Sequence, residues 1–238
     1  PAAANINMLT KIIFVVLLLV LLYAVIQILN PSNKISSMKN GWEETTVEAK
    51  DLKQINNSSN FTYSLWFYVR DWNSRFGEPK ILLDRANNCP QITLGAMQND
   101  IDIVMDCYPT SATTGTSTTS VSHTCNVKNF PLQKWINLAI SLQNGTLDIY
   151  VDGKLHKTCV LPGPPKINKN SPVLITPKGG FNGWTSNFQY WDEPSNPQQI
   201  YDIYKKGYGG GALGNIFNKY KLRFQFLKDN EVAGEFQI

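Results

Sequence analysis

The sequence has few charged residues and no dense block of basic ones. Charged side chains make up 17% of the 238 residues, and the net charge of +4 is spread along the chain. A surface that binds nucleic acid needs clustered Lys and Arg to neutralise phosphates. We therefore expect no nucleic-acid partner.

Residues that bind metals are also few. The two histidines, His123 and His156, each lie near a cysteine, Cys125 and Cys159, but the chain has no short Cys-x-x-Cys pair of the kind that zinc sites use. The possible calcium ligands are three aspartates, Asp84, Asp148 and Asp152. Their spacing matches no calcium-binding loop. The sequence predicts neither a metal nor a cofactor.

Only one hydrophobic run is long, and it lies near the N-terminus. Residues 12–29 are apolar apart from Gln27 and contain neither Pro nor Gly. As a helix the run would be about 27 Å long, close to the hydrocarbon thickness of a bilayer. This predicts a transmembrane helix and a lipid bilayer as partner, with a cleaved signal peptide or a buried helix as alternatives. The expected anchor residues are Ile12, Phe14, Leu18, Leu22 and Ile26.

The side of the membrane on which the rest of the chain lies stays open. Lys34 and Lys39 follow the run whereas only Lys11 precedes it, which favours the cytosolic side. Four cysteines and four glycosylation sequons favour a lumenal or extracellular side. The sequons are at Asn56, Asn57, Asn60 and Asn144.

The remainder has the length of one all-β domain between two extensions. We expect an N-terminal segment over 1–11, the spanning helix over 12–29, a polar stalk over 30–59, a β-sandwich over 60–207, and a Gly-rich linker with a C-terminal hairpin over 208–238.

Strand patterns recur through the predicted sandwich. Residues 61–69 alternate between two partly apolar faces, which is typical of a central strand. Further strands are expected at 80–84, 91–97, 101–107 and 173–175, and a flexible Ser- and Thr-rich loop at 108–124.

Two dipeptides indicate tight hairpin turns. Asn144-Gly145 and Asp152-Gly153 separate strand-like segments and tolerate the positive φ angles that such turns require. The only helical pattern lies at 196–207, before a Gly that ends it. Together these features predict an antiparallel β-sandwich with one short helix.

Four segments resemble the concanavalin A-like, laminin-G-like family in their order. They are W-x-x-L-A-I-S-L at 135–142, N-G-T-L-D-I-Y-V-D-G-K-L at 144–155, F-N-G-W-T-S-N-F-Q-Y-W at 181–191 and P-Q-Q-I-Y-D-I-Y at 197–204. The resemblance covers residues 60–207 and implies a jelly-roll sandwich. It leaves function open, because this fold serves lectins, adhesion modules, hydrolases and structural proteins.

The hydrolases of this family carry a glutamate, aspartate, glutamate triplet on one strand. The nearest candidates here are Asp100, Asp102 and Asp106, which include no glutamate and exceed the family spacing. The resemblance therefore predicts a protein that is not an enzyme, with no catalytic residue and a glycoside hydrolase as a remote alternative.

A glycan site without metal would use exposed aromatic rings as stacking surfaces. The candidates are Trp72, Trp184 and Trp191, whereas Trp66 and Trp135 are expected to fill the core. A membrane-anchored lectin is thus one prediction.

The four cysteines allow three pairings. If residues 91–97 and 101–107 form a hairpin around a turn at 98–100, Cys89 lies almost opposite Cys107, which makes this pair the first choice. Cys125 with Cys159 would follow. Free buried thiols are the alternative.

An anchor, a stalk and one such sandwich also resemble structural proteins of large icosahedral DNA viruses of eukaryotes. This resemblance predicts a minor capsid protein in the virion inner membrane, with capsid proteins as partners of the sandwich and the C-terminal hairpin. A cell-surface or secretory-pathway membrane is the alternative location.

Overall fold

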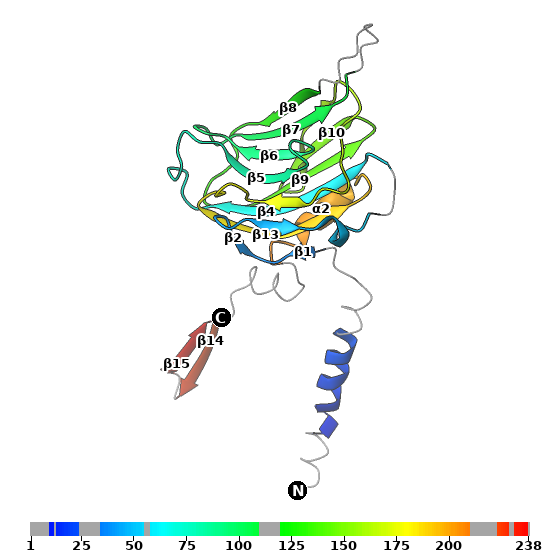
Figure 1. Ribbon diagram of the computed structural model, residues 1–238. Coiled ribbons are helices and arrows are strands. Elements are labelled where there is room, and N and C mark those ends of the chain that lie inside the picture. Colours follow the sequence, from blue (N-terminus) through cyan, green and yellow to red (C-terminus); the bar gives the residue numbers. More distant parts are fainter. Residues whose placement is uncertain are drawn as a thin grey trace. The chain divides into compact units, whose positions relative to one another are not determined.

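The computed structural model describes residues 10–11, 13–23, 34–54, 58–109, 120–209, 223–228 and 231–237 (Figure 1). Residues 1–33 and 34–238 are two separate compact units, and each is described by itself.

The predicted membrane span is not found among the described residues of the hydrophobic run. Residues 10–11 and 13–23 are helical, and Phe14, Leu18 and Leu22 are exposed on this helix. No helix among the described residues is long and apolar enough to cross a membrane. The prediction of a single-pass membrane protein is therefore wrong; Ile12 and Ile26 lie outside the described residues.

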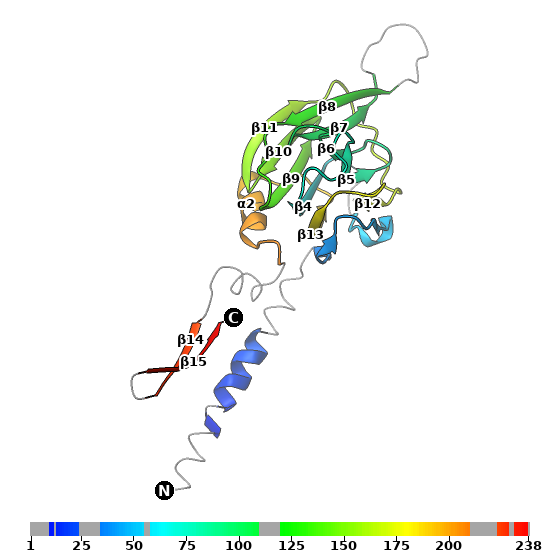
Figure 2. The ribbon, with the colours of Figure 1, turned by 90° about the vertical axis from the view of Figure 1, so that its left-hand side faces the viewer.

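The larger unit contains two antiparallel sheets that face each other (Figures 1 and 2). The first sheet has the order β1 (Lys34–Ser36), β13 (Gly183–Trp191), β4 (Phe61–Val69), β9 (Trp135–Gln143), β10 (Thr146–Val151) and β11 (Lys154–Val160), and β2 (Lys39–Asn40) also pairs with β13. The second has the order β3 (Thr45–Val47), β12 (Val173–Ile175), β5 (Lys80–Arg85), β6 (Gln91–Leu94), β7 (Ile101–Cys107) and β8 (Val121–Val127). The predicted all-β antiparallel sandwich is confirmed.

The core lies between the sheets and follows from strand alternation. Phe61, Leu65 and Phe67 of β4 point into it, as do Ile136 and Ile140 of β9. The neighbouring positions on each strand lie on the opposite, outer face, because side chains alternate along a strand. These outer positions of the first sheet carry the candidate site.

Both predicted hairpin turns are present. Asn144 and Gly145 have φ angles of 49° and 82°, and Asp152 and Gly153 have φ angles of 49° and 75°. Positive φ at both central positions is the geometry that the twist of a two-residue hairpin prefers.

The predicted helix is α2 (Pro197–Lys205), the element that packs on the outer face of the first sheet. Asn196 caps it: its Oδ1 accepts from the Gln199 backbone N–H at 2.9 Å, and Gln199 Oε1 accepts from the Asn196 N–H at 2.8 Å. Ile200 and Ile203 are buried against Ala139 and Tyr150 of the sheet.

Two parts of the sandwich lie outside the predicted strands. Three short strands are formed by residues that were expected in the stalk. β1 and β2 pair with β13, and β3 pairs with β12. A 3₁₀ turn, η1 (Ala49–Asp51), follows them. β8 begins at Val121, inside the expected 108–124 loop, of which 110–119 lie outside the described residues. These strands are short or rich in Ser and Thr, so the alternation of apolar residues is weak.

The C-terminal hairpin is present as β14 (Arg223–Lys228) and β15 (Glu231–Gln237), which pair only with each other among the described strands.

Candidate functional site

A row of aromatic side chains crosses the outer face of the first sheet. Trp184 of β13 pairs with Tyr68 of β4, and Tyr68 pairs with Trp135 of β9, so the three rings stand at one level of the ladder. Their centroids are 5.6 Å and 5.7 Å apart. Tyr208, which follows α2, stacks on Trp135 at 4.4 Å with an interplanar angle of 7°. We call Trp184, Tyr68, Trp135 and Tyr208 the aromatic row; all four are partly exposed.

Backbone geometry fixes one end of the aromatic row. A Cβ at Gly183 would lie 1.9 Å from the carbonyl oxygen of Tyr68, so only glycine permits this approach of β13 to β4. The next residue, Trp184, is thereby held directly beside Tyr68.

Hydrogen bonds hold the backbone beneath the other end. Ser186 Oγ donates to the carbonyl oxygen of Tyr208 at 2.7 Å, and Asn187 Nδ2 donates to that of Gly207 at 2.8 Å. Ser186 and Asn187 lie in an irregular stretch of β13, where Asn187 has a φ angle of 51°. This irregularity directs their polar groups toward the segment after α2.

Two buried polar atoms lie beside the aromatic row without a hydrogen-bond partner among the described residues. They are Trp66 Nε1 and Asn137 Oδ1, on residues that pair directly across β4 and β9. Trp66 is 5% exposed and Asn137 is fully buried. The Trp66 ring stacks on Tyr204 at 5.6 Å and meets the edge of Tyr208 at 6.0 Å.

The structure does not bring the three predicted stacking residues together. Trp184 is part of the aromatic row, but Trp72 packs against Phe130 at 5.7 Å, and Trp191 packs against the cluster beneath α2. Lys80 Nζ lies 4.6 Å from the centre of the Trp72 ring. The indole of Trp72 is thus engaged with the protein itself.

Two members of the site were expected elsewhere. Trp66 and Trp135 were predicted to fill the core, yet both lie on the outer face. The alternation that places Ile136 and Leu138 inward already assigns Trp135 to the other face. The alternation of inward and outward side chains along each strand is therefore the sequence signal that identifies the site.

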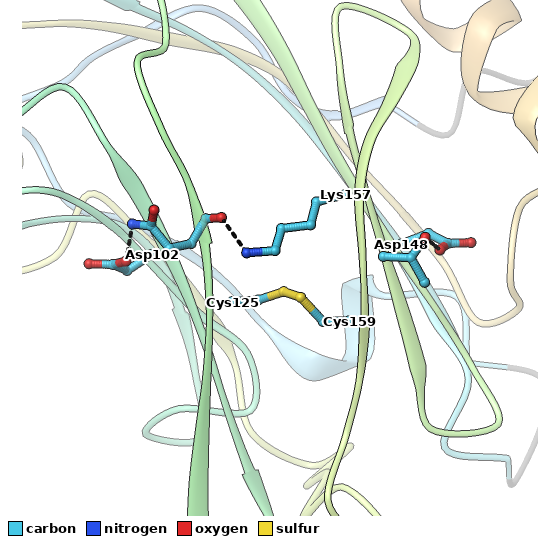
Figure 3. Close-up of a disulfide and its surroundings, with 7 residues drawn as sticks. Asp102, Cys125, Asp148, Lys157 and Cys159 are labelled. Carbon is cyan, nitrogen blue, oxygen red and sulfur yellow. Dashed lines mark hydrogen bonds between the residues drawn. A yellow bond between two sulfur atoms is a disulfide. The ribbon is translucent and has the colours of Figure 1, made fainter.

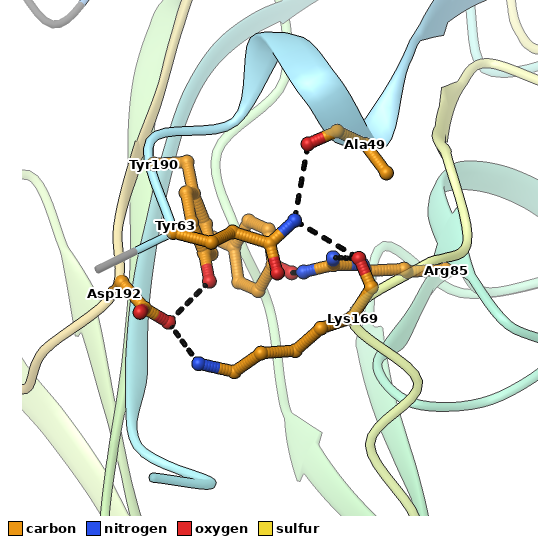
Figure 4. Close-up of polar contacts among 7 residues, drawn as sticks. Ala49, Tyr63, Arg85, Lys169, Tyr190 and Asp192 are labelled. Atoms are coloured by element: carbon orange, nitrogen blue, oxygen red, sulfur yellow. Dashed lines mark hydrogen bonds and ion pairs between the residues drawn. The ribbon is translucent and has the colours of Figure 1, made fainter. Parts of the chain in front are cut away.

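A second polar cluster is buried at one end of the sandwich and is structural (Figure 4). Arg85, 1% exposed, donates to Tyr63 Oη at 2.7 Å, to the Lys169 carbonyl at 2.8 Å and to the Ser171 carbonyl at 3.2 Å. Tyr190 Oη donates to Asp192 at 2.9 Å, and Asp192 also pairs with Lys169. The polar cluster ties the 169–171 loop to both sheets.

Burial raises the pKa of Tyr63 to about 12, against a smaller opposing effect of the Arg85 charge. An unfolded tyrosine ionises near pH 10, so above that pH the unfolded chain loses a proton that the folded chain keeps. The contribution of Tyr63 to the free energy of unfolding is therefore unchanged below pH 10, and about 3 kcal/mol of it is lost as the pH rises through 12. We expect Tyr63→Phe to remove this part of the alkaline loss in urea unfolding curves. Tyr108→Phe, at a 54% exposed tyrosine, is the control. If the free energy of unfolding of Tyr63→Phe fell with rising pH as steeply as that of the unmodified protein, the assignment to Tyr63 would be contradicted.

One of the two predicted disulfides is formed. Cys125 of β8 and Cys159 of β11 are bonded, with Cα atoms 6.4 Å apart, and so join the edge strands of the two sheets (Figure 3). Beside the bond, Lys157 Nζ donates to the Asn126 carbonyl at 3.0 Å. The predicted first choice, Cys89 with Cys107, is not bonded; both thiols are free and buried.

In the structure, Cys89 lies one position out of line with Cys107. The loop covers 95–100 rather than 98–100, and Leu94 pairs with Ile101. Cys89 therefore lies beside Asp106, whose carbonyl accepts from its thiol at 3.2 Å. Burial raises the pKa of the Cys89 thiol to about 11, which keeps it protonated and unreactive near neutral pH.

The three aspartates nearest to the family's catalytic triplet are engaged with neighbouring protein groups. Asp100 accepts from the Asn129 N–H at 3.0 Å, Asp102 accepts from Asn126 Nδ2 at 2.7 Å, and Asp106 accepts from the Ser122 hydroxyl. Four residues along a strand separate Asp102 from Asp106 by about 13 Å. Paired glycosidase carboxylates are about 5 to 10 Å apart.

The candidate metal ligands are dispersed. Asp148 accepts from Thr158 Oγ1 at 2.6 Å, Asp152 pairs with Lys134 at 2.8 Å, and Asp84 accepts from the Asn88 N–H at 3.2 Å. No group of three or more His, Cys, Asp or Glu side chains that could hold a metal occurs in the part of the chain that the structure describes.

The fold and the outer-face site define a lectin-like β-sandwich. A family model described as the concanavalin A-like lectin/glucanases superfamily matches residues 41–201, more than half of the chain. The chain belongs to this superfamily, in its laminin-G-like group. A search of curated proteins gives no match.

Solved structures with a similar fold include binding domains of botulinum neurotoxins. The domain of neurotoxin DC in complex with rat synaptotagmin II is 17% identical, with a TM-score of 0.47, over 61% of this chain and 35% of the other. The serotype G binding domain is 14% identical, with a TM-score of 0.47, over 71% and 46%. The DC domain in complex with SialylT is 15% identical, with a TM-score of 0.49, over 71% and 44%. This chain covers less than half of those chains, and at such identities the likeness concerns the fold alone.

Proposed function

We propose that this protein is a glycan-binding module without catalytic activity, and that Trp184, Tyr68 and Trp135 of the aromatic row form its binding surface. The observation that carries the proposal is the partly exposed row of Trp184, Tyr68 and Trp135 across three neighbouring strands. Pyranose rings present apolar C–H faces that pack on aromatic rings, while their hydroxyls seek polar partners. Membership of a superfamily that includes lectins agrees with this role.

The absence of catalysis is part of the proposal. The superfamily also contains glucanases, whose mechanism needs two carboxylates at a defined separation. Asp102 and Asp106 lie too far apart along β7, and each is tied to a residue of β8. Asp100, which is nearer to Asp102, accepts from the Asn129 N–H at 3.0 Å. A glycan bound on the aromatic row would meet no such pair on β13, β4 or β9.

The proposed function is tested by measuring the binding of the full chain to a printed array of plant, microbial and animal glycans. For a glycan that binds, we expect Trp184→Ala to weaken binding about tenfold, because one lost stacking partner is worth about 1 to 1.5 kcal/mol. Phe76→Ala, at a 59% exposed aromatic residue outside the aromatic row, is the matched control. Binding that is equally weakened by both changes, or by neither, would refute the assignment of the site.

The role in a virus capsid stays a prediction. It was expected from an anchor, a stalk and one sandwich, and the described residues contain no helix that could span a membrane. If no glycan binds, an interaction with other structural proteins becomes the leading role.

A further inference from the structure

Two buried polar atoms without a hydrogen-bond partner lie close together beside the aromatic row, and they restrict what the site can bind. Four buried side-chain polar atoms lack a hydrogen-bond partner among the described residues, and two of them belong to the cross-strand pair Trp66 and Asn137. A buried polar group without a hydrogen-bond partner destabilises the folded protein. Two such groups on adjacent residues of one face therefore suggest a place where a further molecule supplies the missing partner.

The two atoms are complementary in kind. Trp66 Nε1 is a donor only, and Asn137 Oδ1 is an acceptor only. The amide of Asn137 is oriented by its Nδ2, which donates to Ser64 Oγ at 3.0 Å. A hydroxyl is the group that accepts from an indole N–H and donates to an amide oxygen at the same time. A sugar carries such hydroxyls next to the C–H face that packs on aromatic rings.

Tyr208 covers the face of the Trp135 ring. Its ring lies nearly parallel to that of Trp135 at 4.4 Å and is in an edge-to-face arrangement with the Trp66 ring at 6.0 Å. Its backbone is fastened through Ser186 and Asn187, whereas no hydrogen bond of its hydroxyl occurs among the described contacts. Tyr208 stands between Gly207 and Gly209, so no neighbouring side chain on its own segment opposes a rotation of its χ1 angle.

From these contacts we propose that Tyr208 is a displaceable cover over a hydroxyl-binding pair formed by Trp66 Nε1 and Asn137 Oδ1. This proposal rests on the glycan-binding function and adds its regulation and its polar anchor. Rotation of the Tyr208 side chain exposes the face of Trp135 to the sugar ring. One hydroxyl of that ring then accepts from Trp66 and donates to Asn137, which satisfies both buried atoms.

The first test removes the cover. Binding of the methyl glycosides of glucose, galactose, mannose and N-acetylglucosamine is measured by ligand-observed NMR for the full chain and for Tyr208→Ala. We expect Tyr208→Ala to bind at least one glycoside about five- to tenfold more tightly, because the sugar no longer competes with the tyrosine ring. Tyr201→Ala, a 41% exposed tyrosine of α2, is the control and should leave binding unchanged.

The second test identifies the anchor. In the Tyr208→Ala protein, the monodeoxy versions of the bound glycoside are compared, and removal of one particular hydroxyl should weaken binding more than tenfold. Trp66→Phe, which keeps an aromatic ring but loses the N–H, should abolish the preference for that hydroxyl. Near-UV circular dichroism establishes that this variant is folded.

The outcomes separate the two proposals. If the full chain binds glycans through Trp184 but Tyr208→Ala binds no more tightly, the tyrosine is a fixed part of the surface and the cover is refuted. If the deoxy glycosides all bind alike, the Trp66–Asn137 anchor is refuted while glycan binding stands. If neither protein binds any glycoside or any glycan of the array, the proposed function fails and this inference fails with it.

Discussion

Arg85→Leu is expected to lower the free energy of unfolding by about 3 to 5 kcal/mol, the range observed when one member of a buried charged network is removed. Arg85 is 1% exposed and gives hydrogen bonds to Tyr63 and to the carbonyls of Lys169 and Ser171. Leucine removes the donor of Tyr63 Oη and of the Ser171 carbonyl, and the Lys169 carbonyl keeps only its hydrogen bond from Gln54 Nε2 at 2.9 Å. Urea unfolding monitored by tryptophan fluorescence measures the loss.

Two variants serve as controls for this prediction. Tyr63→Phe removes one hydrogen bond of the same cluster and should cost about 1 to 2 kcal/mol at neutral pH. Arg70→Leu, at an exposed arginine, should change stability by less than about 0.5 kcal/mol. A similar loss from Arg85→Leu and Arg70→Leu would mean that the polar cluster does not hold the end of the sandwich together.

The main strands and turns could be predicted because local residues dictate them. The alternation of β4, the two turns at Asn144 and Asp152, and the cap of α2 all depend on neighbours within a few positions. The pairing of β1, β2 and β3 could not be predicted, since strands of two or three residues have too few alternations to show a pattern. Cys89 lies beside Asp106 rather than beside Cys107, a displacement of one position that the strand pattern in the sequence does not resolve.

The candidate site was only partly predictable for a related reason. Trp184 was identified from its residue type, but a stacking surface is defined by which aromatic residues share a face and a ladder level. The alternation of side chains along β9 places Trp135 on the outer face. Only the registers of β13 and β9 on β4 bring Trp184, Tyr68 and Trp135 together. The polar cluster was not anticipated, because Tyr63, Arg85 and Asp192 are far apart in sequence and each looks like an ordinary strand residue.

Reduction of the Cys125–Cys159 bond should lower the free energy of unfolding by about 4 kcal/mol. The bond closes a loop with a sequence separation of 34 residues, and restricting a loop of that length in the unfolded chain is worth about that much. It also joins β8 to β11, the edge strands of the two sheets, where the described contacts between the sheets' edges are otherwise sparse. Without the bond, this edge of the sandwich is expected to open first.

The double variant Cys125→Ala/Cys159→Ala separates this effect from other consequences of reduction. In urea unfolding, adding a reductant to the unmodified protein should reproduce the stability of the double variant, and the reductant should not change the double variant further. Amide hydrogen exchange should show faster exchange in β8 and β11 than in the central strands β4 and β9 once the bond is absent. If the reductant leaves the unfolding midpoint of the unmodified protein in place, the two edges are held by packing alone, and the disulfide does not stabilise the sandwich.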